Sequence, residues 1–71
     1  MARYVIECST SKGLCWLYRT APTKTICDES LALRLSFEKA KIMYRFLSRI
    51  QYYPRVWEVD SLGRRVSLVN F

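Results

Sequence analysis

The stretch "SFEKAKIMYRFLSRIQYYPRVWEVD", residues 36–60, predicts a helix followed by a strand. Ser36 is a capping residue directly before the clearest helical period in the chain. Apolar side chains then fall within one stripe at a period of 3.6: Phe37, Ala40, Met43, Tyr44, Leu47 and Ile50. Pro54 cannot stand inside a helix and directs Tyr53 toward extended geometry. We therefore expect a helix from Ser36 to about Ile50 and a strand over residues 55–60.

A hairpin is predicted before this helix. Residues 3–8, "RYVIEC", alternate between two faces, and residues 9–13, "STSKG", are turn formers. Residues 14–20, "LCWLYRT", are rich in the bulky side chains that suit a pleated strand. Residues 21–26, "APTKTI", contain a proline and no helical period, so we interpret them as a connection leaving the sheet edge. Asp28 then caps a short turn.

A second hairpin is predicted after the helix. The strand over residues 55–60 is followed by the turn "SLG", in which Gly63 supplies any positive φ. Residues 64–71, "RRVSLVNF", complete the hairpin. The order β-β-α-β-β predicts a two-layer α+β fold, with a four-stranded antiparallel sheet and one main helix on one face. The second face of the sheet is then either wet or covered by another copy, and residues 1–71 form a single small domain.

Composition limits the classes of partner and compartment. Twelve basic residues, eight of them Arg, stand against six acidic ones and give a net charge of +6. This charge indicates either an anionic partner or a solvated surface that favours solubility. No apolar run approaches the ~20 residues that span a bilayer, and we recognise no signal peptide. We expect a cytoplasmic protein.

The reactive residue types argue against catalysis and against a cofactor. There is no histidine, and the three cysteines, Cys8, Cys15 and Cys27, form no C-x-x-C pair. We therefore expect no metal site, and we expect the cysteines to be free structural thiols, although Cys8 and Cys15 could face each other across the first hairpin. With two glycines in the chain, no phosphate-binding loop is available. We interpret the protein as a binding protein without enzymatic activity or a cofactor.

The candidate contact surface is the basic side of the predicted helix. Ile42 and Phe46 fall off the core stripe, four residues apart and therefore adjacent on the helix surface. An apolar pair among Arg side chains suits a protein contact better than a phosphate-binding surface. Arg64 and Arg65 on the terminal hairpin are further candidates. The predicted partner-binding residues are Lys41, Ile42, Arg45, Phe46, Arg49, Arg64 and Arg65.

Two other functions stay open at this point. The first is a small nucleic-acid-binding protein that holds phosphates with its Arg-rich helix face, with aromatic side chains available to stack on bases. The RNP-type strand pattern of RNA readers is not present in this sequence. The second is a homodimeric accessory protein, since domains of this size gain core by pairing.

The layout "RYVI…WLY…DESLALRLSFEKAKIMYRFL…RVWEVD" resembles small phage-encoded proteins, and it is also similar to some small basic anti-CRISPR proteins. The resemblance lies in an acidic turn leading to "A-x-R-x-S" and in the helix start "S-x-x-x-A-K", here Ser36, Ala40 and Lys41. It implies a non-catalytic inhibitor or modulator that occupies a surface on a host protein or ribonucleoprotein complex, such as a CRISPR surveillance complex. A phage-encoded protein of this kind is expected in the host cytoplasm. Many such inhibitors are acidic mimics of nucleic acid, and the charge of +6 is opposite in sign.

Overall fold

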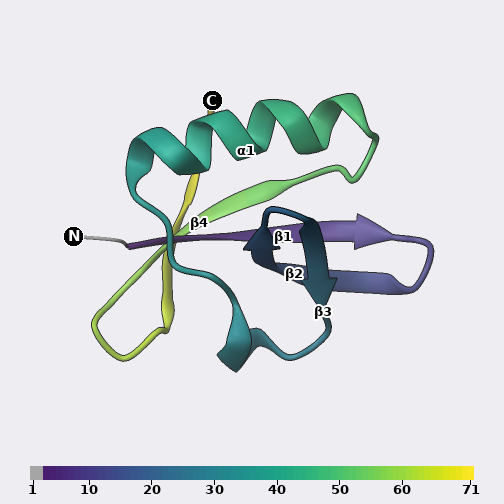
Figure 1. Cartoon of the computed structure of the whole chain (residues 1–71). Helices are drawn as coiled ribbons and strands as arrows, with labels where there is room; N and C mark the ends of the chain where they lie inside the picture. Colours follow the sequence, from purple (N-terminus) through teal and green to yellow (C-terminus); the bar gives the residue numbers. More distant parts are fainter. Residues whose placement is uncertain (1–2) are drawn as a thin grey trace.

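The computed structural model describes residues 3–71, whose strands form one antiparallel sheet in the order β3-β2-β1-β4-β5 (Figure 1). The single α-helix of this part of the chain lies along one face of the sheet, between β3 and β4 in the sequence. The fold is therefore α+β, as predicted. The elements are β1 (Tyr4–Thr10), β2 (Gly13–Thr20), β3 (Thr23–Ile26), the short 3-10 helix η1 (Glu29–Leu31), α1 (Phe37–Arg49), β4 (Arg55–Val59) and β5 (Arg65–Val69).

The helix predicted from the sequence is confirmed to within one residue at each end. Ser36 is its N-cap, and the Ser36 hydroxyl accepts a hydrogen bond of 3.3 Å from the Lys39 N–H. Glu38 in the first turn and Arg49 in the last turn complement the helix dipole. Asp28 caps η1 as expected, because its carboxylate accepts from the Ser30 N–H at 3.0 Å.

The prediction of four strands is wrong, because residues 23–26 form a fifth. They are β3, which pairs with β2 in the register Trp16 with Ile26 and Leu17 with Thr25. Thr23, Thr25 and Ile26 are β-branched and suit a strand, and the preceding proline occupies the turn, where its missing N–H costs no ladder hydrogen bond. A short edge strand of four residues gives too little alternation to be recognised beside that proline.

The two faces of the sheet are covered differently. On the α1 face, the fully buried side chains include Ile6, Leu17, Leu47 and Val56. On the opposite face a smaller cluster holds Val5, Trp16 and Val59, with Ala32 and Trp57 packed against it. We expected this second face to be wet or covered by another copy. That expectation is corrected in part, because the segment containing η1 and Ala32 covers some of the face from within the same chain.

The chain passes from the second face to the α1 face between β1 and β2. These strands pair only where Glu7–Thr10 face Gly13–Trp16, so their other halves diverge. The Leu33 N–H donates to the Leu17 carbonyl at 2.8 Å, and the Leu35 N–H donates to the Tyr4 carbonyl at 2.7 Å. The crossing segment thereby satisfies backbone groups that the diverging strands leave without partners.

Two positions of the predicted core stripe are not buried. Phe37 and Ile50 are 43% and 41% exposed, whereas Ala40 and Leu47 are buried and Met43 and Tyr44 pack at the edge of the core. Phe37 instead joins an aromatic cluster at the rim, with ring centroids 5.6 Å from Tyr4 and 5.5 Å from Phe71. The stripe was wider in the sequence than the surface that the sheet offers to the helix.

The connection from α1 to β4 also differs from expectation. We expected extended geometry at Tyr53 before the proline, but the φ angle of Tyr53 is 46°, and that of Gln51 is 61°. Left-handed geometry is uncommon for residues with large side chains. It turns the chain back sharply from the end of α1 into β4, which runs beside β1. The tight return, rather than the local preference of the residue before proline, determines this backbone.

Candidate functional site

An apolar ridge runs along the outer side of α1. It consists of Ile42, Phe46 and Ile50, spaced four residues apart and therefore one above the other on the helix. Ile42 is 62% exposed, and Phe46 is 42% exposed. The sequence pattern predicted that Ile42 and Phe46 lie outside the core, and the structure confirms this. It assigned Ile50 to the core, whereas the structure makes Ile50 the third member of the exposed ridge.

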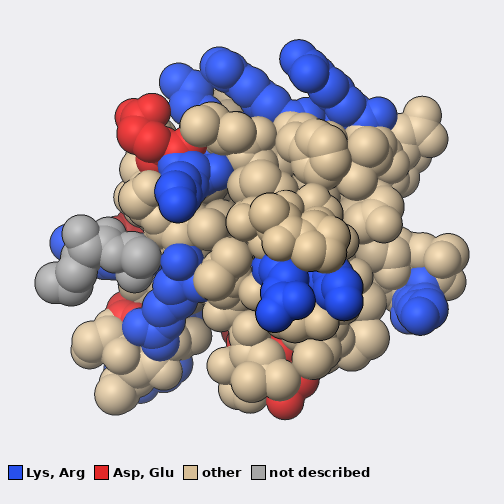
Figure 2. All heavy atoms as spheres, viewed as in Figure 1, with Lys and Arg blue, Asp and Glu red and all other residues tan. Residues whose placement is uncertain are grey.

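A basic ridge lies beside the apolar one. Lys41, Arg45 and Arg49 each precede a member of the apolar ridge by one residue, which is about 100° around the helix. None of the three makes an ion pair with a carboxylate of residues 3–71. Figure 2 shows several Lys and Arg side chains along the top of the molecule, where α1 lies in the same view, with an acidic group at the left end of that row and further acidic atoms at the lower left and bottom. The outer side of α1 is therefore two parallel rows, one apolar and one cationic.

A shallow groove borders the other flank of the apolar ridge. Thr20, Lys39, Ile42 and Met43 line a hollow of about 220 Å³ between α1 and the end of β2. A second hollow of about 440 Å³ shares Thr20 and Lys39 with the first and extends to Leu33. We call the two together the α1 groove. Its lining combines apolar side chains with Lys39, so it can accept an apolar side chain beside an acidic group.

Arg64 and Arg65 do not join this surface. The Arg65 guanidinium lies over the Trp16 and Trp57 rings, 5.4 and 5.2 Å from their centroids, on the sheet face opposite α1. Its Nε is also 3.3 Å from a Glu29 carboxylate oxygen. The Nε of Arg64 is 3.0 Å from a carboxylate oxygen of Asp60 in the β4–β5 turn. Both arginines thus have intramolecular partners, unlike the three members of the basic ridge.

Hydrogen bonds at the β4–β5 turn affect the charge of Asp60. The pKa of its carboxyl group lies below the ordinary value, first because the carboxylate accepts from the Arg64 backbone N–H at 2.9 Å, and further because it accepts from the Arg64 side chain. The turn therefore holds Arg64 near its carboxylate at neutral pH. This geometry favours a structural role for Arg64.

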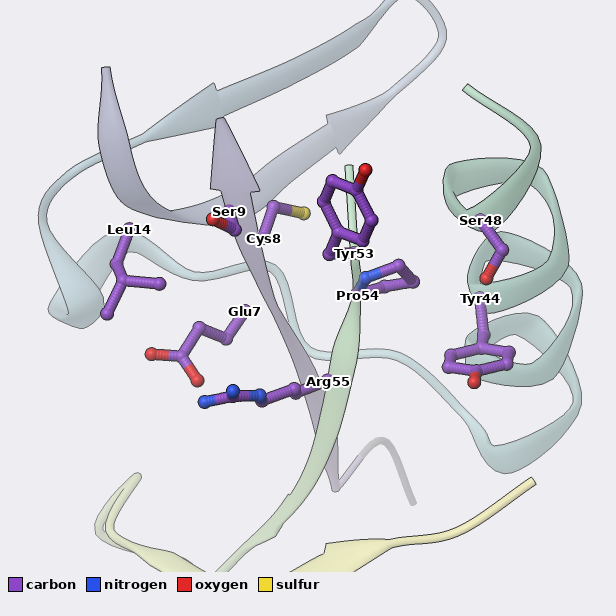
Figure 3. Close-up of a pocket in the computed structure, with 9 residues that line it drawn as sticks. All are labelled: Glu7, Cys8, Ser9, Leu14, Tyr44, Ser48, Tyr53, Pro54 and Arg55. Atoms are coloured by element: carbon purple, nitrogen blue, oxygen red, sulfur yellow. The ribbon is translucent and has the colours of Figure 1, made fainter. Parts of the chain in front are cut away.

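Sequence reasoning missed a pocket of about 470 Å³ at the ends of β1 and β4. Figure 3 shows Glu7 and Arg55 pointing toward each other on one side, Tyr44 and Ser48 on the α1 side, and Tyr53 between them. Glu7 is only 7% exposed and accepts a hydrogen bond of 3.2 Å from the Trp57 indole N–H. The pocket depends on the strand register that places Glu7 of β1 opposite Arg55 of β4 and on the left-handed backbone of Tyr53. No local sequence signal reveals either feature.

The side chains that line this pocket differ in reactivity. Its one cysteine is Cys8, which is fully buried, and burial raises the pKa of that thiol to about 11. The thiol is therefore protonated at neutral pH and is a poor nucleophile. Glu7 is held by Trp57, which orients its carboxylate. The pocket offers a carboxylate, a guanidinium and a tyrosine ring to a ligand side chain.

Within residues 3–71, no three His, Cys, Asp or Glu side chains are grouped as a metal ion would require. In the same range, no helix combines the length and the apolar character needed to cross a bilayer. No protein-family model matches the chain, and comparisons with curated proteins and with solved structures find no significant match.

Proposed function

We propose that this protein is a non-catalytic binding protein that contacts a host macromolecular complex through the outer side of α1. The observation that carries the proposal is the exposed apolar ridge of Ile42, Phe46 and Ile50 beside three cations that have no partner within the described chain. Exposed aromatic and aliphatic side chains next to Arg are typical of the centre and rim of a protein interface. The resemblance to small phage-encoded inhibitors supports a host complex as the target.

The two ridges define the chemistry of the partner surface. The apolar ridge and the α1 groove need an apolar side chain or a shallow hydrophobic patch opposite them. The basic ridge needs carboxylates at the border of that patch, because Lys and Arg pair with carboxylates and Arg can do so in bidentate geometry. We therefore infer a protein surface on which a hydrophobic patch is bordered by Asp or Glu residues.

A nucleic-acid partner is the second candidate, and a specific observation favours it. Three of the twelve basic side chains, Arg3, Arg64 and Arg65, form ion pairs within the described chain, and the other nine do not. Cations without internal partners can contact phosphates, and such contacts make binding strongly dependent on salt. They occur on several sides of the molecule rather than in one stripe, and the apolar ridge does not suit a phosphate backbone.

The first experiment is a pull-down of tagged full-length protein from lysate, with and without nuclease, followed by titration of whatever is recovered. We expect capture to survive nuclease. Phe46→Ala should weaken binding at least about tenfold, because a desolvated aromatic anchor commonly contributes most to an interface. Arg49→Ala should weaken it less, about two- to fivefold, as for a charge at the rim.

Matched controls separate this surface from the rest of the molecule. Leu62→Ala removes an exposed apolar side chain from the β4–β5 turn, and Lys24→Ala removes an exposed cation from β3. Both should bind like the wild type, and circular dichroism should show all variants folded. A nucleic-acid partner would give the reverse order, with Arg45→Ala and Arg49→Ala each lowering the salt slope by about one while Phe46→Ala changes little. That result would overturn the protein-binding proposal.

A further inference from the structure

The three cysteines, which are scattered in the sequence, lie in one row across the sheet. Cys8 in β1 is the register partner of Cys15 in β2. Trp16 pairs with Ile26, so the next opposed positions along β2 and β3 are Cys15 and Cys27. The row therefore runs from the buried Cys8 through the buried Cys15 to the exposed Cys27 just beyond β3.

Two of the three sulfurs in this row are in contact. The Sγ atoms of Cys15 and Cys27 lie 3.2 Å apart, which is a direct contact between two thiols. A hydroxyl oxygen of Thr10 lies 3.7 Å from the Cys15 sulfur on the other side. Cross-strand positions bring Cβ atoms near the separation that a disulfide requires, so Cys15 and Cys27 can be joined with little movement of the backbone.

We propose that Cys15 and Cys27 form an oxidisable dithiol, which a peroxide converts to an intramolecular disulfide. This site is separate from the α1 surface. Its consequence is mechanical, because Cys27 stands between β3 and the segment that carries η1 over the second sheet face. A bond to Cys15 would fix the end of the edge strand β3, and the start of that covering segment, to β2.

The chemistry balances with one peroxide molecule. The exposed Cys27 sulfur, as thiolate, attacks a peroxide oxygen and breaks the O–O bond, giving a sulfenic acid and, after protonation, water. The Cys15 sulfur then attacks the sulfenic sulfur, forms the S–S bond, loses its proton and releases a second water. Two thiols are oxidised by two electrons in total, and the peroxide is reduced to two waters.

Exposure and ionisation assign the roles of the three thiols. The pKa of Cys27 lies above its ordinary value because its thiol hydrogen-bonds with Cys15, so the first step should accelerate as pH rises and the thiolate becomes populated. Cys8 has no solvent access, and burial raises its pKa to about 11. Cys8 therefore stays a thiol while its two neighbours react.

Trypsin provides a direct test on the full chain. Cleavage after Arg3, Lys12, Arg19, Lys24 and Arg34 places the three cysteines in separate peptides, residues 4–12, 13–19 and 25–34. Wild-type protein at low concentration is treated with equimolar hydrogen peroxide, alkylated, digested without reductant and analysed by mass spectrometry. We expect an intact mass lower by two hydrogen atoms, peptides 13–19 and 25–34 linked, and peptide 4–12 alkylated at Cys8.

Variants and a stability measurement complete the test. Cys27→Ser, at an exposed position, should stay folded and lose the cross-link, whereas Cys8→Ala should retain it. The oxidised wild type should melt about 5 °C or more above its reduced form, and dithiothreitol should reverse the shift. A link between peptides 4–12 and 13–19, a dimer joined through Cys27, or full alkylation of all three cysteines after peroxide treatment would overturn the proposal.

Discussion

The two faces of the sheet are stabilised in different ways, although the same strands form both. The α1 face is a largely aliphatic core in which Ile6, Leu17, Leu47 and Val56 are completely buried. The opposite face buries Val5, Trp16 and Val59. Polar groups cover part of this cluster, among them the guanidinium of Arg65 over two tryptophan rings. The first face is covered by a helix, and the second by a short segment and by long side chains.

This difference follows from the size of each cover. A helix of 13 residues presents a continuous apolar stripe, so aliphatic side chains from both layers can interdigitate without polar atoms. The segment around η1 covers only part of the second face, so large side chains with a polar end must shield the remainder. Glu7 shows the same solution, because its buried carboxylate accepts a hydrogen bond from the Trp57 indole N–H. We therefore expect substitutions on the two faces to lower the free energy of unfolding by different amounts.

The largest expected effect is the loss of the α1 face. Leu47 is fully buried between helix and sheet, so Leu47→Asp places a charge where even truncation to Ala should cost about 2–5 kcal/mol. Because small domains have only about 5–15 kcal/mol of stability, or less, the variant should be unfolded at room temperature. Far-ultraviolet circular dichroism on heating is the measurement. A melting curve matching that of the wild type would contradict the packing of α1 on the sheet.

A matched pair of valines sharpens the comparison. Val56 and Val59 lie on the same strand, and both are buried, but they belong to the α1 face and to the opposite face respectively. Val56→Ala should cost about 2–3 kcal/mol, because its tightly packed neighbours cannot fill the cavity. Val59→Ala should cost about 1–2 kcal/mol, because the smaller cluster around it can relax. Urea unfolding of both variants gives the comparison, and equal costs would mean that the second face is as rigid as the first.

The smallest expected effect concerns the two arginines of the terminal hairpin. Arg65→Ala removes the contact with both tryptophan rings and the ion pair with Glu29, so it should cost about 1 kcal/mol. Arg64→Ala removes an exposed pair with Asp60 and should change the stability less than Arg65→Ala does. Thermal melts at low and high salt measure the two variants side by side. If Arg64→Ala proves the more damaging, the stacked arginine does not stabilise the second face.

Only the part of the candidate site that lies on one helix was predicted from the sequence. Ile42, Phe46 and the basic ridge follow from positions along one helix, and the structure places all of them on its outer side. The α1 groove and the pocket beside Tyr53 were not predicted. Each is formed by residues from different elements, so it depends on how β2 diverges from β1 and on how the chain returns from α1 into β4.

The sequence by itself determined the α+β class, the bounds of α1 and both long hairpins, because caps, turn formers and periodicity act over a few neighbouring residues. Only the tertiary structure decided the rest. Thr23–Ile26 became a strand because β2 offered it an unpaired edge, Ile50 was left 41% exposed as the C-cap of α1, and Cys15 and Cys27 came into contact through strand register. Such outcomes depend on backbone pairing and available surface between segments far apart in the chain, which no local pattern contains.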